Sequence, residues 1–262
     1  MAVALNLDWS FGTKQITGTV TDSFDAWGAN LTADLATNLL PVGAGKFTMT
    51  IPPGTGSPLY TPGGYGYASI TNNESGTVTF AGALADGAKF SETEPLSKDG
   101  VAPLYATPYN KSGLLIGWID FSNSVPTGTV TWIKPATNFP ATYPEGFVNT
   151  VDVTGSAYVP STPALTLSNG TLTIADADVA GLPLVFNVAV SNNNAIAKLS
   201  GSPTNKLSGS ITASTDVISI TFRPTGLGST SDKTATGVVL QSGASAAGAF
   251  TGTTNTGSID LR

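Results

Sequence analysis

Apolar and polar residues alternate along most of this chain, and no other feature of the sequence constrains its fold as strongly. A period of two places successive side chains on opposite faces of a strand, one face buried and the other in solvent. Thr and Val, which favour strands, are frequent in these segments. The clearest segments are 46–51, 77–80, 128–133, 164–167, 171–174, 217–222 and 258–261. The pattern predicts an all-β protein, an antiparallel β-barrel or β-sandwich with little or no helix.

Turn sequences between these segments indicate that neighbouring strands run mostly antiparallel. Asp86-Gly87, Asp99-Gly100 and Asn169-Gly170 supply the positive-φ pairs that tight hairpins need. A helical spacing occurs over 25–40, where apolar residues recur at every fourth position. The Gly, Asn and Thr content of that segment fits a pair of strands equally well.

Two Pro-containing stretches divide the chain. The stretch 52–64 carries four prolines among glycines, which a central strand does not tolerate, and we predict a long surface loop there. The stretch 154–163 marks a change in composition, because all four Trp precede it and the remainder is rich in Ala, Ser and Thr. We therefore predict an aromatic-rich β domain over 1–155 and a Ser/Thr/Ala-rich β domain over 156–262, with one continuous β domain as the alternative.

The chain contains no His and no Cys, and this excludes many kinds of function. Hydrolases with a Ser-His-Asp or Cys-His arrangement, zinc hydrolases and facial-triad iron enzymes each lose a required residue. A net charge of −6 with 11 scattered Lys and Arg leaves no basic stripe for nucleic acid. No apolar run approaches the length of about 18 residues that membrane insertion requires. The first residues lack the positive region of a signal peptide, and we interpret the chain as a fragment of a larger protein.

Carboxylates are the remaining candidates for chemistry. Glu92 and Glu94 lie two residues apart on an expected strand, so their side chains point the same way. Their spacing resembles the pair of catalytic carboxylates in a glycosidase only superficially. Their polar surroundings favour a solvated edge strand. Two acidic clusters occur in the sequence, Asp176 with Asp178 and Asp22 with Asp25. Both lack the Gly and the distal Glu of an EF-hand calcium loop, and we expect no metal bound at either.

Aromatic side chains are the better candidates for ligand binding. Tyr60, Tyr65 and Tyr67 flank the Pro/Gly-rich stretch, and planar rings on a polar β surface can pack against sugar rings. By contrast, Trp118 and Trp132 sit within apolar strand segments, and we predict that both belong to the core.

Several motifs spread over most of the chain, and they lie at 63–68, 82–90, 95–100, 103–105, 113–121, 132–135, 143–147, 205–209 and 237–241. Together they resemble a β-rich module of large secreted or surface-anchored bacterial proteins, where it often occurs beside immunoglobulin-like repeats. The segment Gly100-Val101-Ala102-Pro103 departs from the pattern, which has aromatic or charged residues before that proline. The resemblance implies an extracellular β module, and that family has no established reaction, ligand or catalytic residues to carry over.

These observations predict a non-catalytic structural or adhesive module of a bacterial cell-surface or secreted protein. A carbohydrate-binding module is the alternative, with Tyr60, Tyr65 and Tyr67 as ligand-binding residues. A carboxylate-based enzyme acting on glycosides is the third hypothesis. We expect no cofactor, a glycan or neighbouring domains of the same surface protein as partners, and an extracellular or cell-surface location.

Overall fold

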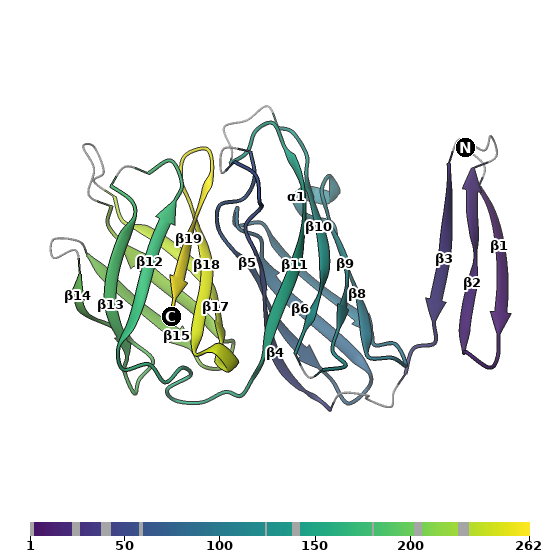
Figure 1. Ribbon diagram of the computed structural model, residues 1–262, viewed down its shortest axis with the longest axis horizontal. Coiled ribbons are helices and arrows are strands. Elements are labelled where there is room, and N and C mark those ends of the chain that lie inside the picture. The colour runs from purple at the N-terminus through teal and green to yellow at the C-terminus, as the bar shows by residue number, and fades with distance from the viewer. Residues whose placement is uncertain are drawn as a thin grey trace.

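The structure of the chain, a computed structural model, describes residues 3–22, 27–37, 43–57, 60–123, 125–137, 142–179, 181–201, 206–224 and 231–262. Almost all of its regular structure is antiparallel strand, arranged in three sheets (Figure 1), and this confirms the predicted all-β class. The helical elements are a single turn, α1 (Pro108–Lys111), and a short 3-10 turn, η1 (Gln241–Gly243). No helix in the described part of the chain is long and apolar enough to cross a membrane.

The first large sheet has eight strands and curls until its two edge strands lie close together, which gives a nearly closed barrel. We call it the first barrel. Its strands are, in spatial order, β7 (Lys89–Pro95), β6 (Thr77–Ala83), β5 (Gly66–Asn72), β4 (Gly45–Ile51), β11 (Phe147–Tyr158), β10 (Thr127–Lys134), β9 (Leu114–Asp120) and β8 (Val101–Ala106).

The second large sheet, the second barrel, also has eight antiparallel strands and the same nearly closed form. The last strand of the chain lies in the middle of this sheet. The spatial order is β14 (Ile196–Gly201), β13 (Leu184–Val190), β12 (Gly170–Asp176), β19 (Thr256–Leu261), β18 (Ser245–Thr251), β17 (Lys233–Leu240), β16 (Val217–Phe222) and β15 (Leu207–Thr212).

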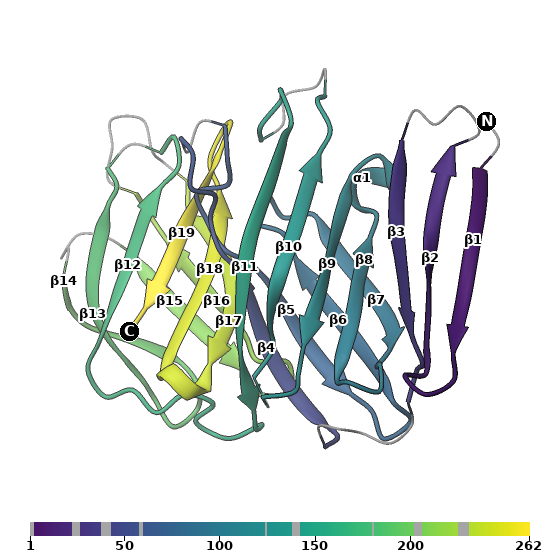
Figure 2. The same cartoon turned by 45° about the vertical axis from the view of Figure 1, so that its right-hand side comes forward.

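The remaining three strands form a small meander, β1 (Val3–Ser10), β2 (Gln15–Asp22) and β3 (Gly28–Asp34), which we call the arm. Figures 1 and 2 show it standing beside the first barrel, at the end of the molecule away from the second barrel. Backbone bonds join its base to the barrel, because Thr37 donates to Leu96 O and Lys98 donates to Leu35 O.

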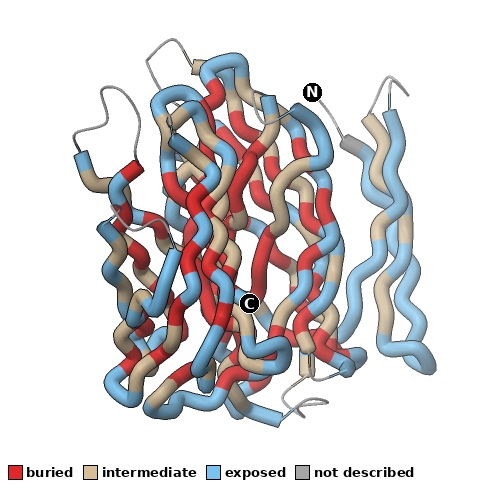
Figure 3. The backbone as a smooth tube through the Cα atoms, turned by 60° about the vertical axis from the view of Figure 1, so that its left-hand side comes forward, coloured by how far each residue is buried: buried red, intermediate tan, exposed pale blue. Residues whose placement is uncertain are grey.

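Each barrel encloses its own apolar core, and buried segments line the inside of both barrels (Figure 3). The alternation in the sequence explains this burial. In β5, for example, Ala68 and Ile70 are fully buried, whereas Tyr67, Ser69 and Thr71 point outward. Aromatic contacts fill both interiors, such as Phe47 with Phe121 and Phe222 with Phe250.

The segment 25–40, for which the sequence leaves a helix and a pair of strands as alternatives, contains one strand over Gly28–Asp34, and residues 25–26 and 38–40 lie outside the described residues. Two other predictions about local structure are confirmed. The Asp86-Gly87 turn joins β6 to β7 with Gly87 at a φ of 86°. The described part of 52–64 contains no strand, although Gly63 and Gly64 are buried rather than on the surface.

Other local predictions were wrong. The segment 164–167 is not a strand, because the backbone of Ala164 bonds to the side chains of Asn194 and Gln241 instead of to a neighbouring strand. Asn169-Gly170 is therefore not a hairpin turn. Asp99-Gly100 does form a turn, but it connects β7 to β8, the two unpaired edges of the first barrel.

The two tryptophans predicted to be buried differ in environment. Trp132 lies inside the first barrel, as predicted. Trp118 lies on the outer face of β9, where 58% of it is exposed, and the prediction for it was wrong.

The predicted boundary between residues 155 and 156 falls within β11. The first half of the stretch 154–163 that we expected to be a connection is therefore strand, up to Tyr158, and the strandless connection to β12 begins at Val159. Each barrel has a separate core, and the division into two domains stays a prediction.

Candidate functional site

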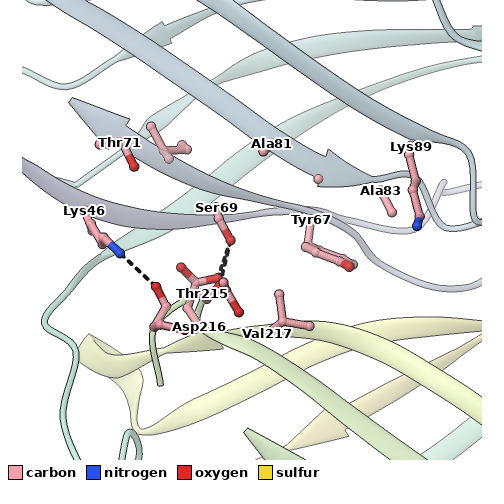
Figure 4. Close-up of a pocket in the computed structure, with 13 residues that line it drawn as sticks. Lys46, Tyr67, Ser69, Thr71, Ala81, Ala83, Lys89, Thr215, Asp216 and Val217 are labelled. Atoms are coloured by element: carbon pink, nitrogen blue, oxygen red, sulfur yellow. Dashed lines mark hydrogen bonds between the residues drawn. The ribbon is translucent and has the colours of Figure 1, made fainter. Parts of the chain in front are cut away.

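A pocket between the two barrels brings together segments that are distant in the sequence. It has a volume of about 340 Å³ and lies between the outer face of β5 and β6 and the β15–β16 hairpin (Figure 4). Three small residues of β6 line it, Ala81, Gly82 and Ala83, together with Tyr67 from the neighbouring strand. Lys46 and Lys89 lie toward opposite ends of it. The pocket therefore combines one aromatic ring, small apolar residues and two cations.

A buried carboxyl group lies at the back of this pocket. Asp216, in the β15–β16 hairpin, is 2% exposed and has a φ of 59°. Ser69 Oγ on β5 lies 2.5 Å from Asp216 Oδ1 and 2.8 Å from Thr215 O. Burial raises the pKa of Asp216 to about 7, while the Ser69 hydrogen bond and the charge of Lys46 act in the opposite direction.

Two further contacts from the first barrel hold the same hairpin. The Lys46 ammonium donates to Ser214 O at 2.8 Å. The Tyr158 hydroxyl, from the end of β11, donates to Ala213 O at 2.7 Å. Burial, and next the negative charge of Asp216, raise the pKa of Tyr158 to about 12. The hairpin is thus bound by β4, β5 and β11 together.

A second group of contacts joins the barrels at the Pro/Gly-rich segment. The side chain of Tyr143, from the β10–β11 connection, is buried, and its hydroxyl accepts hydrogen bonds from Gly63 N at 3.2 Å and Thr256 N at 3.0 Å. The Tyr143 backbone N–H donates to Thr254 O at 2.8 Å. This one residue therefore connects two segments of the first barrel to the β18–β19 hairpin of the second.

The glycines of this segment allow the two barrels to approach at backbone distance. A Cβ atom at Gly63 would lie 2.5 Å from Thr256 O, and one at Gly64 would lie 2.2 Å from Gly257 O. Beside them, Tyr65 N donates to Gly248 O at 3.2 Å. Close packing of backbones explains why two adjacent residues here lack side chains.

All three tyrosines predicted as ligand-binding residues line hollows at or near this junction. Tyr67 lies between the 340 Å³ pocket and a smaller hollow that it shares with Tyr65. Tyr65 also faces a hollow beside Arg262, and burial raises its pKa. Tyr60 is 65% exposed and lines a separate hollow with Tyr143. The structure thus brings Tyr65 and Tyr67 together at one shared hollow, where both are half-buried, and places Tyr60 in a separate one.

Sequence reasoning missed Asp216, Ser69 and Tyr143. Asp216 follows Thr215 in a turn, where an acidic residue is usually solvated, and nothing local signals its burial. Tyr143 was noted only within the motif 143–147. The one sequence signal for this junction was the adjacent pair Gly63-Gly64, because neighbouring glycines can mark a close approach of two backbones.

A buried ion pair closes one end of the first barrel. Lys134 and Asp86 are nearly inaccessible and lie 2.9 Å apart. The Tyr109 hydroxyl donates to the same carboxylate oxygen at 2.7 Å and accepts from the Trp132 indole at 3.1 Å. Burial, together with the neighbouring Asp86, raises the pKa of Tyr109 well above its ordinary value. Every polar group here has a partner, which is the arrangement of a structural network.

The acidic candidates are placed differently from a catalytic pair. Glu92 and Glu94 lie on the edge strand β7, opposite Phe80 and Val78, and point toward the barrel interior at its open seam. The prediction of a solvated face was wrong, because both are partly buried. Inward-pointing charges on an edge strand discourage pairing with another chain.

The predicted acidic clusters have partners within the chain. Asp178 accepts from the backbone of Thr253 and Thr254, and these bonds lower its pKa although burial acts in the opposite direction. Asp176 accepts from Ser258. Asp25 lies outside the described residues. Within the residues that are described, no three acidic side chains gather as metal ligands.

Comparisons with known proteins assign no family. No protein-family model matches the chain, and no curated protein matches its sequence. Among solved structures, the chain is similar to the vaccine antigen transferrin binding protein B of Haemophilus parasuis, crystallised as a tryptophan-to-alanine mutant, with 10% sequence identity and a TM-score of 0.27. The match covers 99% of this chain and 65% of that one, so the chain spans less than two thirds of its length. A likeness of this size assigns neither activity nor partner.

Proposed function

We propose that this protein is a non-catalytic structural or adhesive module of a bacterial cell-surface or secreted protein, in which two barrels form one rigid unit. The observation that carries the proposal is the buried, hydrogen-bonded junction between the barrels, centred on Tyr143 and on the Ser69–Asp216 pair. Buried polar contacts with full partners fix one arrangement, since any displacement leaves groups unsatisfied.

Three further features support this proposal. The absence of His and Cys removes the common catalytic and metal-ligating groups. The motifs of the chain resemble modules of surface-anchored bacterial proteins, which supports an extracellular location. A rigid two-barrel unit without disulfides is suited to holding neighbouring domains apart.

The position of the tryptophans provides a direct test of rigidity. All four precede residue 153, so their fluorescence reports on the arm and the first barrel, whereas circular dichroism reports on both barrels. If the barrels unfold as one unit, the two signals should give coincident transitions in guanidinium. A circular dichroism transition that is separate from the fluorescence transition would contradict the rigid unit.

Carbohydrate binding is a second candidate function, and the pocket around Tyr67 favours it. A half-buried aromatic ring beside small residues, with Lys46 and Lys89 nearby, offers apolar contact and polar partners for a sugar. We expect that wild type would retain a glycan on an array and that Tyr65→Ala with Tyr67→Ala would not. Tyr105→Ala, on the outer face of β8, is the matched control. Absence of any glycan signal for wild type would remove this candidate and leave the structural one.

A further inference from the structure

The arm has one apolar face whose large side chains stay about half exposed in the described structure. In β1, Leu5, Leu7 and Trp9 share this face, and they are 54%, 55% and 49% exposed. Antiparallel register places Val20 and Ile16 of β2 opposite Leu5 and Trp9 on the same face. The other face carries Asn6, Asp8 and Ser10 on β1, paired with polar residues of β2.

A second exposed apolar surface lies on the outer face of the first barrel. Tyr105 on β8 pairs with Ile116 on β9, and Pro103 pairs with Trp118. Tyr105, Ile116 and Trp118 are 52%, 41% and 58% exposed. We call these four residues the β8–β9 patch.

The arm does not cover this patch in its own chain. Figures 1 and 2 show the arm beside the barrel, and the large side chains of both surfaces stay about half exposed. The two surfaces approach each other at the base of the arm, where Ala33, Pro103 and Trp118 line a hollow of about 160 Å³. There the Lys98 ammonium lies 3.7 Å from Asp34 and fixes the end of β3 beside the barrel.

We propose that the arm is exchanged between two copies of this chain, so that its apolar face packs on the β8–β9 patch of the second copy. One occupant then covers both exposed surfaces of each chain. Charge favours a second copy as the occupant. The chain has a net charge of −6, so two copies repel each other when their charged surfaces meet. The centres of the arm face and of the β8–β9 patch carry no charge, and Asp22 lies at one end of the arm face.

The size of the surfaces favours a reciprocal exchange. Three strands about 4.8 Å apart and about seven residues long present a face of about 300 Å². One such contact buries about 600 Å² counting both sides, which is less than the roughly 1,200 Å² of a specific interface. Two reciprocal contacts reach that value, so the exchange should give a closed dimer rather than a single arm contact.

Light scattering coupled to size-exclusion chromatography tests the proposal over micromolar to millimolar concentration. We expect wild type to be a dimer that dissociates on dilution, with a red shift of tryptophan emission as Trp9 and Trp118 become exposed. Leu7→Lys with Trp9→Lys should be monomeric at every concentration. Asn6→Lys with Ser10→Lys adds the same charge to the opposite face of the same strand, and it should remain a dimer.

A variant of the patch separates the exchange from other modes of association. Trp118→Lys should also be monomeric, whereas Ser91→Lys on the exposed face of β7 should not change the oligomeric state. A dimeric Trp118→Lys protein would mean that the arm faces pair with each other, and it would overturn the exchange. A wild-type protein that is monomeric throughout would overturn it as well. Unchanged circular dichroism in each variant shows that both barrels are folded, since these residues lie outside both cores.

Discussion

Replacing Asp216 by Asn should measure the cost of burying a carboxylate between the two barrels. The Asn side chain has nearly the same shape, tolerates the positive φ of this position and can still accept the hydrogen bond from Ser69. The substitution therefore removes the charge and leaves the contact. Its effect on stability should depend on pH, because the pKa of Asp216 is raised to about 7 by burial.

The sign and size of the effect follow from linkage. A carboxyl group whose pKa is raised in the folded state contributes stability that is complete below its unfolded pKa of about 3.9 and is lost as pH rises to the folded value. A difference of about 3 pH units corresponds to a loss of at most about 4 kcal/mol between pH 4 and pH 7. The Asn variant lacks this loss. We expect it to match wild type near pH 4 and to be more stable by about 2–4 kcal/mol at pH 8.

Guanidinium unfolding at pH 4, 6 and 8 provides the measurement. Asp232→Asn is the control, because hydrogen bonds from Lys206 and Arg223 lower the pKa of this partly exposed carboxyl group. Its substitution should act in the opposite direction, destabilising the protein at neutral pH. If Asp216→Asn were less stable than wild type at pH 8, the bonds to the carboxylate would outweigh its desolvation, and our reasoning would be refuted.

Three other substitutions test the junction and the core by thermal or chemical unfolding. Tyr143→Phe leaves the backbone N–H of Thr256 without its acceptor and should cost about 1–3 kcal/mol, and an unchanged midpoint would contradict a role for the hydroxyl. Gly64→Ala forces a Cβ into backbone of the second barrel and should cost about 1–3 kcal/mol, so full stability would mean that the barrels can separate there without loss. Asp86→Ala leaves the Lys134 charge buried and unpaired and should cost about 3–5 kcal/mol, whereas a loss below about 1 kcal/mol would indicate that water reaches the ammonium.

The fold class could be predicted from the sequence because the signal for a strand is local. Alternation in 128–133 and 217–222 records which side chains face a core, and both segments are strands. The opposite environments of Trp118 and Trp132 could not be predicted in this way, because both lie in apolar runs. Whether a residue of such a run faces the core depends on whether it falls on the inward or the outward position of the alternation. Gly117 in β9 and Gly128 in β10 have no side chains, so they obscure which position is which.

The candidate site was only partly predictable for a similar reason. Tyr65 and Tyr67 could be selected as aromatics beside a loop, and they do lie at the junction. Asp216 could not be selected, because its burial arises when the hairpin docks on Ser69, about 150 residues earlier in the chain. Contacts between two separately formed barrels leave no periodic signal in either sequence segment.

The central position of β19 has a consequence for biosynthesis. β11 completes the first barrel, so that this barrel can close once Tyr158 has been made. β19 lies between β12 and β18, and the second barrel therefore lacks a middle strand until Leu261 has been made. The second barrel consequently stays open until β19 has been made, about 100 residues after the first barrel can close. A chain that is exported unfolded would keep this barrel in a translocation-competent state until β19 is available to fill the gap.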